Sequence, residues 1–425
     1  MPHARRMQPG ARVGNRVFSG CGWPYPTSFR CGAARPGSLN TMSIPSSRFP
    51  AQRIGIVGGG QLARMMAEAA PSLGLSVTVL DPTPECPASA FAAQIVGDFD
   101  DLEKLSALAR ASDVVTLDIE AVSAVCLEAL EHGGVRVAPS AKVLATIQDK
   151  LQQKRFLHAH DLPTSDFVAV DAGDDSALRS FGIPCVMKAR RHGYDGRGVK
   201  VVRGEDEATL MLAVPCLAER LVDIDKELAV MVARSASGEI VSYPVVEAEF
   251  DARANILDLI RAPAVVSAQV AARCTQLAIR CVEALDGVGI FGIEFFLDRN
   301  GAVLINEISP RPHNSGHYTI EACATSQFAQ HLRAVAGLPL GSTTLVQPAA
   351  SFNLLGEPGA NGKPVVHGLG LAAQIPGAAV HLYGKHSVKG FRKMGHVTVT
   401  GATLDEATQR ANTLRGVLKV VGDKA

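Results

Sequence analysis

The chain has 425 residues, of which 47% are hydrophobic and 20% charged, and its formal net charge is +1. Such a length exceeds what a single hydrophobic core usually fills, so we expect two or three domains. The near-zero net charge gives no general attraction to nucleic acid or to anionic lipid, so neither is an expected partner. The positive groups that hold any anionic ligand must therefore be local.

Nine cysteines without a CxxC pair argue against a zinc site or a disulfide framework, and they suit a reducing, cytoplasmic compartment. The longest uncharged stretch of the folded part, residues 364–384, contains Pro376 and four glycines. A membrane-spanning helix needs about 20 predominantly apolar residues. We therefore expect no membrane segment.

Residues 1–50 differ from the rest, because they contain seven arginines and no acidic residue. An Arg-rich leader without acids is typical of an organelle transit peptide. The other interpretation is an upstream stretch read as coding, with the true start near Met42. We prefer the second because the leader lacks a clear amphipathic pattern, and in either case we expect it to be disordered.

From Arg53 on, apolar runs alternate with helical patterns, as in a doubly wound α/β domain. We place this Rossmann-like N-terminal domain at residues 51–139. Its expected elements are strands at 54–57, 76–80, 113–117 and 135–138, a glycine turn at 58–60, and helices at 61–73, near 101–109 and near 122–132.

A helix over residues 140–160 follows, with Ser140 suited to be its N-cap. Short strands with few helices between them then indicate an antiparallel α+β domain, which we place at residues 140–340. The expected strands lie at 168–170, 185–189, 199–203, 216–221, 227–233, 240–246, 289–297 and 302–308, with a helix at 267–285. Residues 341–425 predict a small strand-rich C-terminal domain.

Gly58-x-Gly60-x-x-Ala63 lies between a strand and a helix, and Asp81 ends the next strand, which is nearly the complete dinucleotide fingerprint. Alone, it favours an NAD-dependent dehydrogenase. The same geometry binds other phosphate groups, because backbone N–H groups and a helix N-terminus attract anions, and glycine turns also occur without a ligand. Pro82 turns the chain away where a ribose contact would need a short loop.

Two further segments are typical of an ATP site. Lys188 ends a predicted strand, and the glycine-rich loop 193–198 that follows can close over polyphosphate with backbone N–H groups and cations. The alternative is a flexible hairpin with solvated charges. Residues 219–222 read as an edge strand whose backbone pairs with a purine, with Glu227 at a ribose hydroxyl, although surface strands often carry such residues.

Glu294 and Glu307 each lie among apolar residues on two strands joined by a hairpin at 298–301. A carboxylate in such surroundings is costly unless it is paired or bound to a metal. Together the two can hold a hard cation, with Asn306 adding a carbonyl oxygen. The sequence therefore predicts a magnesium site, or manganese in its place, and salt bridges to arginines are the alternative.

The loop after Glu307 carries Arg311, His313 and Asn314, which offer a place for a second anion near the γ-phosphate. A metal site at His313 and His317 is the rival interpretation.

Four segments together resemble the 5-(carboxyamino)imidazole ribonucleotide synthase family of the ATP-grasp superfamily: GGGQL at 58–62, GYDGRG at 193–198, LINEISPRPHNSGH at 304–317 and KxxxxxxRKMGH at 385–396. The resemblance runs from about Arg53 to Val399. It implies an ATP-grasp fold, a homodimer, and ATP- and bicarbonate-dependent carboxylation of 5-aminoimidazole ribonucleotide with release of ADP and phosphate.

The resemblance also implies roles for individual residues. For ATP it implies Lys150, Lys188, Gly193, Tyr194, Asp195, Gly196, Arg197, Gly198, Val199, Glu219, Arg220, Leu221, Val222, Glu227, Asn306 and Glu307, with Glu294 and Glu307 on magnesium. For the ribonucleotide it implies Gly60, Gln61, Leu62, Glu120, Lys385 and Arg392, and around the carboxylating centre Tyr194, Asp195, Arg197, Arg311, His313 and Asn314.

Two positions depart from the family pattern. The family usually has EFE where this chain has Asp118-Ile119-Glu120, which puts the role of Asp118 in doubt. A histidine common after the strand near Val246 is missing, and Glu247 is a candidate to replace its contact. Rival functions that remain are a sibling ligase such as the formate-using glycinamide ribonucleotide transformylase or biotin carboxylase, a dehydrogenase, and a non-catalytic nucleotide-binding module.

Overall fold

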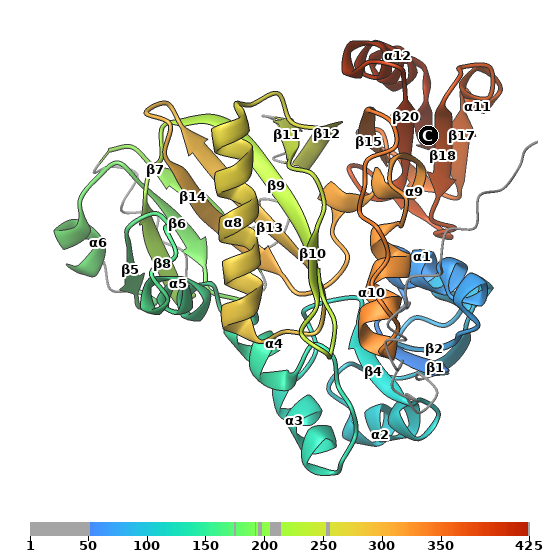
Figure 1. Cartoon of the computed structure of the whole chain (residues 1–425), viewed down its shortest axis with the longest axis horizontal. Coiled ribbons are helices and arrows are strands. Elements are labelled where there is room, and N and C mark those ends of the chain that lie inside the picture. Colours follow the sequence, from blue (N-terminus) through green and yellow to red (C-terminus); the bar gives the residue numbers. More distant parts are fainter. Residues whose placement is uncertain are drawn as a thin grey trace, which may run out of the picture. The chain divides into compact units, whose positions relative to one another are not determined.

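The computed structural model describes residues 52–173, 176–191, 193, 198–204, 214–251 and 256–423. The leader at 1–50 and four residues of the glycine-rich loop, Tyr194 to Arg197, lie outside the described residues. Residues 48–425 form one compact unit. Figure 1 labels its elements.

The N-terminal sheet is parallel, in the order β3-β2-β1-β4. Its apolar strands are covered by α1, α2 and α3, as expected for a doubly wound sheet. Strand β3 was not predicted, and the strand expected at 135–138 is only an isolated bridge of Val137 to Val115. The bounds are β1 Arg53–Val57, α1 Gln61–Ala69, β2 Ser76–Asp81, β3 Ala93–Val96, α2 Leu102–Arg110, β4 Val114–Leu117 and α3 Ala124–His132.

The helix predicted over 140–160 is two helices, α4 Ala141–Gln148 and α5 Lys150–Ala159. Ser140 caps α4, as expected. The break occurs at Asp149, whose backbone is extended and whose carboxylate accepts from the backbone N–H groups of Leu151 and Gln152. An Asp N-cap begins a new helix and so ends the old one.

A small antiparallel sheet follows in the order β5-β8-β6-β7, with α6 Ser176–Phe181 beside it. Its buried side chains, including Met187 and Ala218, form a core of their own. The strands are β5 Phe167–Val170, β6 Cys185–Ala189, β7 Val199–Val202 and β8 Cys216–Arg220.

The large sheet has the order β14-β13-β9-β11-β12-β15-β20-β18, with β10 paired to β9. The expected strand at 240–246 is therefore two strands, β10 and β11. Helix α8 lies across β9, β13 and β14 and buries their apolar side chains (Figure 1). These elements are β9 Ile224–Arg234, β10 Ile240–Ser242, β11 Val246–Asp251, β12 Ile256–Ala262, α8 Ala268–Leu285, β13 Gly289–Asp298 and β14 Val303–Ser309.

The sheet continues into the C-terminal segment, because β12 pairs with β15 and β15 with β20. Helix α12 packs on this end of the sheet. The remaining elements are α9 Thr319–Ala322, α10 Gln327–Ala336, β15 Ala349–Leu355, β16 Asn361–Gly362, β17 Pro364–His367, α11 Leu369–Ala372, β18 Ala378–Leu382, β19 Val388–Lys389, β20 Lys393–Thr400, α12 Leu404–Val417 and β21 Lys419–Gly422.

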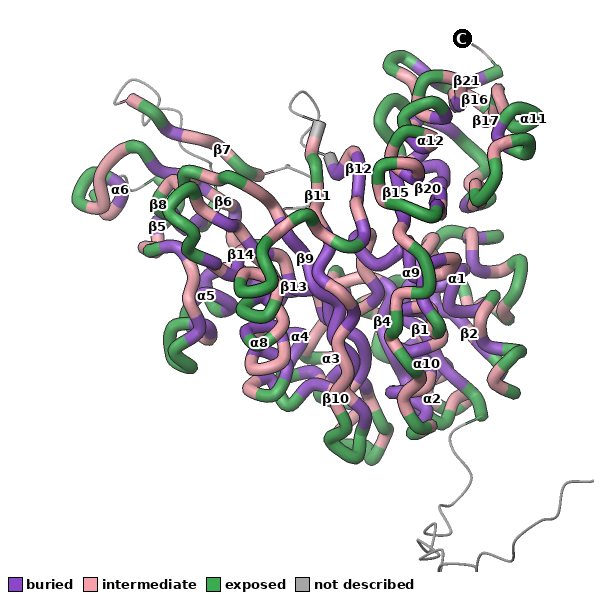
Figure 2. The backbone as a smooth tube through the Cα atoms, turned by 45° about the horizontal axis from the view of Figure 1, so that its top comes forward, coloured by how far each residue is buried: buried purple, intermediate pink, exposed green. Residues whose placement is uncertain are grey.

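Helix α10 connects the N-terminal sheet to the large sheet. His331 on this helix is fully buried, bonds Thr116 of β4 at 2.7 Å and accepts from the backbone N–H of Ile290 in β13 at 3.1 Å. Phe328 and Leu332 of α10 pack with α1 in one core. Figure 2 shows the strands that meet this helix as largely buried.

Across the described ranges, none of the helices has both the length and the apolar character that a membrane crossing requires. The seven cysteines in those ranges are all free thiols.

Candidate active site

Glu294 and Glu307 are direct Cα partners across the antiparallel pair β13–β14. A register shift follows Glu294, so the next paired residues are Phe295 and Ile305, which are both buried on the opposite side. The two glutamates are less buried than their sequence surroundings suggest, since their side chains are 24% and 42% exposed. The pair therefore lines an accessible face of the sheet.

The electrostatics of this pair suit a cation. Burial, together with repulsion from Glu307 and Glu227, raises the pKa of Glu294 to about 8. Burial also favours the neutral form of Glu307, but Lys150 outweighs it and lowers the pKa of that carboxyl. Carboxylate oxygens are the preferred ligands of Mg²⁺, which usually takes one or two of them together with substrate phosphates. The donor set fits that ion.

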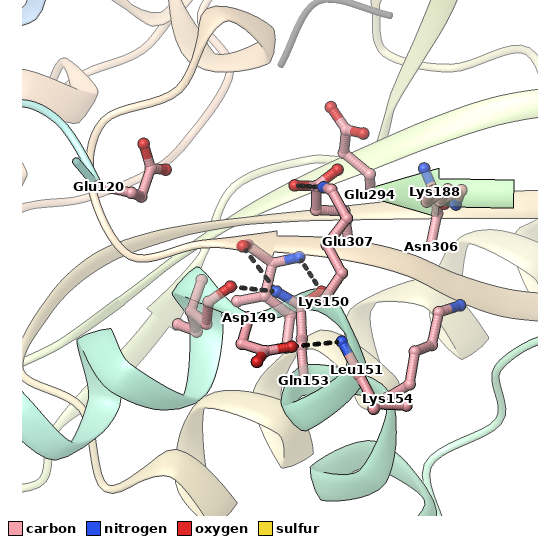
Figure 3. Close-up of polar contacts among 12 residues, drawn as sticks. Glu120, Asp149, Lys150, Leu151, Gln153, Lys154, Lys188, Glu294, Asn306 and Glu307 are labelled. Atoms are coloured by element: carbon pink, nitrogen blue, oxygen red, sulfur yellow. Dashed lines mark hydrogen bonds and ion pairs between the residues drawn. The ribbon is translucent and has the colours of Figure 1, made fainter. Parts of the chain in front are cut away.

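Cations surround the carboxylates on one side. The ammonium of Lys150 contacts Glu307 directly, and Lys188 donates to Asn306 Oδ1 at 3.0 Å (Figure 3). His313 Nε2 lies 3.4 Å from Glu294 Oε1. Lysines beside metal-binding carboxylates are what a bound polyphosphate and its cation require together.

The side chain of Glu219 is buried and engaged by the protein. Its carboxylate lies 3.0 Å from Lys188 Nζ and 3.1 Å from Lys154 Nζ, and it accepts from Ser165 Oγ at 2.7 Å. Although burial opposes ionisation, the two lysines and the Ser165 hydrogen bond lower the pKa of Glu219 to about 2. The prediction of an edge strand at this point is wrong, because β8 lies between β5 and β6 and Glu219 is paired with both Phe167 and Val186. Lys154 was missed by the sequence reasoning, because on its own it reads as a surface helix lysine.

The other residues predicted to bind ATP lie on β8, on β9 and at the glycine-rich loop. Burial raises the pKa of Glu227 to about 7 on β9. Arg220 turns away, donating to the carbonyl oxygen of Phe181 and stacking over its ring. The backbone N–H of Ala189 donates to the carbonyl of Gly198 at 2.7 Å, which joins the end of the glycine-rich loop to β6. Leu221 and Val222 follow β8 directly. Gly193 is the first residue of the glycine-rich loop, and Val199 begins β7 just after it. The loop residues Tyr194, Asp195, Gly196 and Arg197 lie outside the described residues.

The structure brings Arg311 to Glu120, with Nη2 2.7 Å from Oε2. Arg311 Nε and Asn314 Nδ2 are buried without a hydrogen-bond partner among the described residues. Buried donors without a partner are costly, so a ligand anion at this point would satisfy them.

The backbone of this loop is fixed by Gln327, a residue that sequence reasoning also missed. Gln327 Oε1 accepts from the N–H of His313 at 2.9 Å, and its Nε2 donates to the carbonyl of His313 at 2.8 Å. Nε2 also lies 2.9 Å from Nδ1 of the buried His317. In the described part of the chain no group of three His, Cys, Asp or Glu could hold a metal, either at His313 and His317 or at the glutamate pair. The glutamate pair would therefore bind magnesium together with substrate phosphates.

The glycine turn already holds two carboxylates of the protein. Asp81 accepts from the N–H groups of Gly59 and Thr83, both at 2.8 Å. Asp118 accepts from Gly60 N at 2.6 Å and from Ala63 N at 3.0 Å. A Cβ at Gly60 would lie 2.8 Å from Asp118 Oδ2, so glycine is needed for this contact. Only the first residues of α1, Gln61 and Leu62, are left to offer N–H groups.

The C-terminal segment approaches this turn at Tyr383 and Gly384. Tyr383 packs in the same core as Leu62, and a Cβ at Gly384 would lie 2.6 Å from Arg64 Nη1 of α1. Lys385 donates to the carbonyl of Lys393 at 2.7 Å, and the exposed Arg392 donates to Ser387. Lys385, next to Gly384, therefore follows a residue that lies beside α1, whereas the described contacts of the Arg392 side chain are with Ser387 and do not reach the turn.

Glu247, the candidate replacement for the missing histidine, is held by two cations, Lys226 at 2.8 Å and Arg261 at 3.4 Å. These contacts tie it to β9 and β12.

Comparison with known proteins agrees with this geometry. Three family models match in order along the chain: the ribonucleotide synthetase preATP-grasp domain at residues 51–148, the ATP-grasp domain at 155–328 and the phosphoribosylaminoimidazole carboxylase C-terminal domain at 349–410. A relative from Synechococcus elongatus, named N5-carboxyaminoimidazole ribonucleotide synthase, is 41% identical and aligns with 88% of this chain and 96% of its own length. The chain belongs to the N5-carboxyaminoimidazole ribonucleotide synthase family.

Solved structures of the N5-carboxyaminoimidazole ribonucleotide synthase family superpose on the chain. The synthetase from Thermotoga maritima is 45% identical, with a TM-score of 0.82 over 88% of this chain and 100% of its own. The Aspergillus clavatus enzyme, solved with ADP and 5-aminoimidazole ribonucleotide, is 34% identical, with a TM-score of 0.78 over 86% of this chain and 98% of its own.

The family also includes longer chains. The phosphoribosylaminoimidazole carboxylase of Vigna aconitifolia, named as chloroplastic, is 42% identical over 83% of this chain, which spans 64% of that relative's length. The predicted ATP-grasp fold, with its Rossmann-like N-terminal and strand-rich C-terminal parts, is confirmed by these matches. The chain is an ATP-dependent enzyme of the ATP-grasp type.

Proposed function

We propose that this chain carboxylates the amine of 5-aminoimidazole ribonucleotide, using ATP and bicarbonate and releasing ADP and phosphate, as a step of purine biosynthesis. The observation that carries the proposal is the juxtaposition of two sites. One is the Glu294–Glu307 pair with its lysines, and the other is the glycine turn, which Gly384 approaches at Arg64. Arg311 lies between them, because it interacts electrostatically with Asp118 at the turn and with Glu307 of the pair. Arg311 and Glu120 lie in contact with one another and supply the polar groups of the acceptor side.

On the ATP side, Glu294, Glu307 and Asn306 would hold magnesium, which when bound neutralises charge on the transferring phosphoryl group. Lys150 and Lys188 would take the phosphate oxygens, each giving up part of its present contact with Glu307 or Asn306. Gly193, Gly198, Val199 and the loop residues between them would close over the polyphosphate. The adenine would lie along residues 219–222, with Glu227 at the ribose.

On the acceptor side, the ribonucleotide phosphate would take the N–H groups of Gln61 and Leu62 at the N-terminus of α1, which favours an anion. Lys385 and Arg392 would add cations, and Glu120 would contact the ribonucleotide while remaining paired to Arg311.

The chemistry divides into two steps. A bicarbonate oxygen attacks the γ-phosphorus of ATP, the bond to the β-phosphate oxygen breaks, and carboxyphosphate and ADP form. The exocyclic amine then attacks the carboxyl carbon, phosphate leaves, and the amine loses a proton. Arg311, His313 and Asn314 would bind the bicarbonate and the departing phosphate; in support, Arg311 Nε and Asn314 Nδ2 are buried donors without a partner among the described residues.

Closure matters because water would hydrolyse carboxyphosphate. Tyr194, Asp195 and Arg197 belong to the loop that we expect to close, with Asp195 as the base for the amine proton.

The decisive experiment incubates the purified chain with Mg-ATP and measures ADP release. The assay mixtures pair either bicarbonate or formate with either 5-aminoimidazole ribonucleotide or glycinamide ribonucleotide. ADP release that requires bicarbonate and the aminoimidazole ribonucleotide together, with ¹³C-bicarbonate found in the product, is the expected result. Release with formate and glycinamide ribonucleotide would assign the chain to a sibling activity.

A dehydrogenase is the weaker alternative, since Asp81 and Asp118 already accept the N–H groups of the glycine turn. Stabilisation by NADH and none by Mg-ATP in a thermal-shift assay would favour it. We further propose a homodimer, as the family resemblance suggests, and a cytoplasmic location, which the nine cysteines without a CxxC pair suit. Light scattering tests the first, and fractionation with N-terminal sequencing of the mature protein tests the second and the fate of residues 1–50.

A further inference from the structure

Lys154 is a buried lysine that the proposed mechanism does not use. It projects from α5, and its side chain is 2% exposed. Its ammonium has three oxygen partners: Thr164 Oγ1 at 2.6 Å, Ser165 Oγ at 3.1 Å and Glu219 Oε2 at 3.1 Å. An ammonium has three N–H donors, so Lys154 is fully occupied by the protein and has none left for ATP.

These partners join Lys154 to the ATP site by two routes. Glu219 connects it to Lys188, which lies 3.0 Å from the other carboxylate oxygen and itself donates to Asn306. Thr164 donates to the carbonyl of Ile305 at 2.7 Å, directly before Asn306 on β14. The small sheet, which carries Glu219 and Lys188, is thereby tied to the large sheet, which carries the proposed metal-binding pair.

The charges of Glu219, Lys154 and Lys188 explain why a charged residue is needed at position 154. Glu219 is 3% exposed and carries one negative charge, which Lys154 and Lys188 share. Without Lys154, Lys188 alone would neutralise the carboxylate, and it would be held there more strongly. With Lys154 present, the cluster keeps a net positive charge, which a polyphosphate can use.

We propose that Lys154 is a positioning residue for ATP: it neutralises Glu219, so that Lys188 stays available to the phosphates, and it holds β14 against the small sheet. Burial and repulsion from Lys188 lower the pKa of Lys154 to about 8, while Glu219 keeps the ammonium charged at neutral pH. The inference rests on the proposed function, because it assumes that Lys188 binds ATP.

The test compares Lys154→Met with Arg155→Met, which removes the same charge from an exposed position one residue along α5. We expect Lys154→Met to raise the KM for ATP and the Kd for Mg-ADP at least about 10-fold, the scale of losing one charge-assisted contact. The KM for the ribonucleotide should stay within about twofold, as should all constants of Arg155→Met.

A second variant separates charge balance from other roles. Lys154→Met combined with Glu219→Gln removes both charges and frees Lys188 again. We expect this double variant to bind Mg-ADP more tightly than Lys154→Met alone. If it binds no better, Lys154 does not act through the charge of Glu219, and the proposal is overturned.

Equal changes in both KM values, or a fall in kcat alone, would show a merely structural role and also overturn the proposal. Should Lys154→Met fail to fold, Ser165→Ala removes the hydroxyl between Lys154 and Glu219 and should still raise the KM for ATP selectively. An unchanged KM for ATP in that variant counts against the idea. Wild-type protein that neither binds Mg-ATP nor carboxylates would instead remove the proposed function.

Discussion

Glu294 and Glu307 face each other across β13 and β14, and Lys150 reaches only the second of them. The pair is therefore electrostatically unequal: Glu307 is held ionised by its lysine, whereas the pKa of Glu294 is raised by burial and by its two glutamate neighbours. A divalent cation between them would balance the second charge, and this asymmetry leads to the first prediction.

Glu307→Gln should reduce turnover at least about 100-fold, the scale of losing one electrostatic stabiliser at a phosphoryl-transfer site. It removes a proposed carboxylate ligand of the metal and leaves Lys150 without its carboxylate partner. The measurement is ADP release at saturating substrates over a range of Mg²⁺ concentrations. Glu283→Gln, on the exposed side of α8, is the control and should retain full activity. Near wild-type turnover of Glu307→Gln would remove the metal-site assignment.

Arg392→Ala should raise the KM for the ribonucleotide about 10-fold, the scale of one charge-assisted hydrogen bond, and leave the KM for ATP unchanged. Arg392 is exposed, and within the described residues its guanidinium donates to Ser387, so its loss costs the fold little. Steady-state kinetics with each substrate varied in turn gives both constants. The exposed Lys389 provides the matched control as Lys389→Ala. Equal effects on the two KM values would place Arg392 elsewhere.

Asp118→Asn should raise the KM for the ribonucleotide selectively, by about 10-fold, because the amide group of Asn offers a donor to a backbone N–H where a carboxylate offered an acceptor. The turn would lose the contact that sets the start of α1. Kinetics with each substrate varied in turn again separates the two KM values.

The control for Asp118 lies at the other end of the same strand. Asp113 accepts from the N–H groups of Gln52 and Arg53 just before β4, whereas Asp118 accepts from Gly60 and Ala63 just after it. Asp113→Asn should lower the melting temperature without changing either KM. If the two variants behave alike, Asp118 serves the fold and not the substrate.

Much of the fold follows from local patterns. The hairpin that joins the strands of Glu294 and Glu307 could be predicted from its apolar flanks and its turn residues. The direct pairing of the two glutamates could not, because the hairpin register places Asn306 opposite Glu294 and a register shift brings Glu307 there instead. The break at Asp149 could not be placed by the helical pattern around it, since the apolar spacing continues through the cap. The carboxylate of Asp149 accepts from the backbone N–H groups of Leu151 and Gln152 and so begins a new helix within that pattern.

The supporting residues of the site were harder to see, because each depends on a partner far along the chain. Lys154 lies in a polar stretch and becomes buried only when Glu219 and Ser165 are folded against it. The role of Asp118 becomes visible only when it accepts from the backbone N–H of Gly60, a residue far from it in the sequence. Sequence motifs predict the residues that are proposed to bind ligands. The residues that hold those side chains in place belong to no local sequence motif.

Acid sensitivity gives the last prediction, through His331. Its Nδ1 accepts from the backbone N–H of Ile290, so Nε2 carries the proton and donates to Thr116. Burial lowers the pKa of His331 to about 3, whereas in the unfolded chain it is about 6.5. Below pH 6.5 the unfolded state therefore binds more protons, and stability falls with pH by up to about 1.4 kcal/mol per pH unit through this group.

His331→Gln keeps an acceptor and a donor but cannot titrate, so its melting temperature should fall less between pH 6.5 and 5 than that of the wild type, although it starts lower at pH 7. The buried His317 and His396, whose pKa values are lowered by burial, keep part of the acid sensitivity in the variant. His132→Gln, at the exposed last residue of α3, should retain the full wild-type slope. Parallel curves for His331→Gln and wild type would contradict the prediction. They would mean that His331 gains no proton on unfolding, against the neutral imidazole that accepts from Ile290.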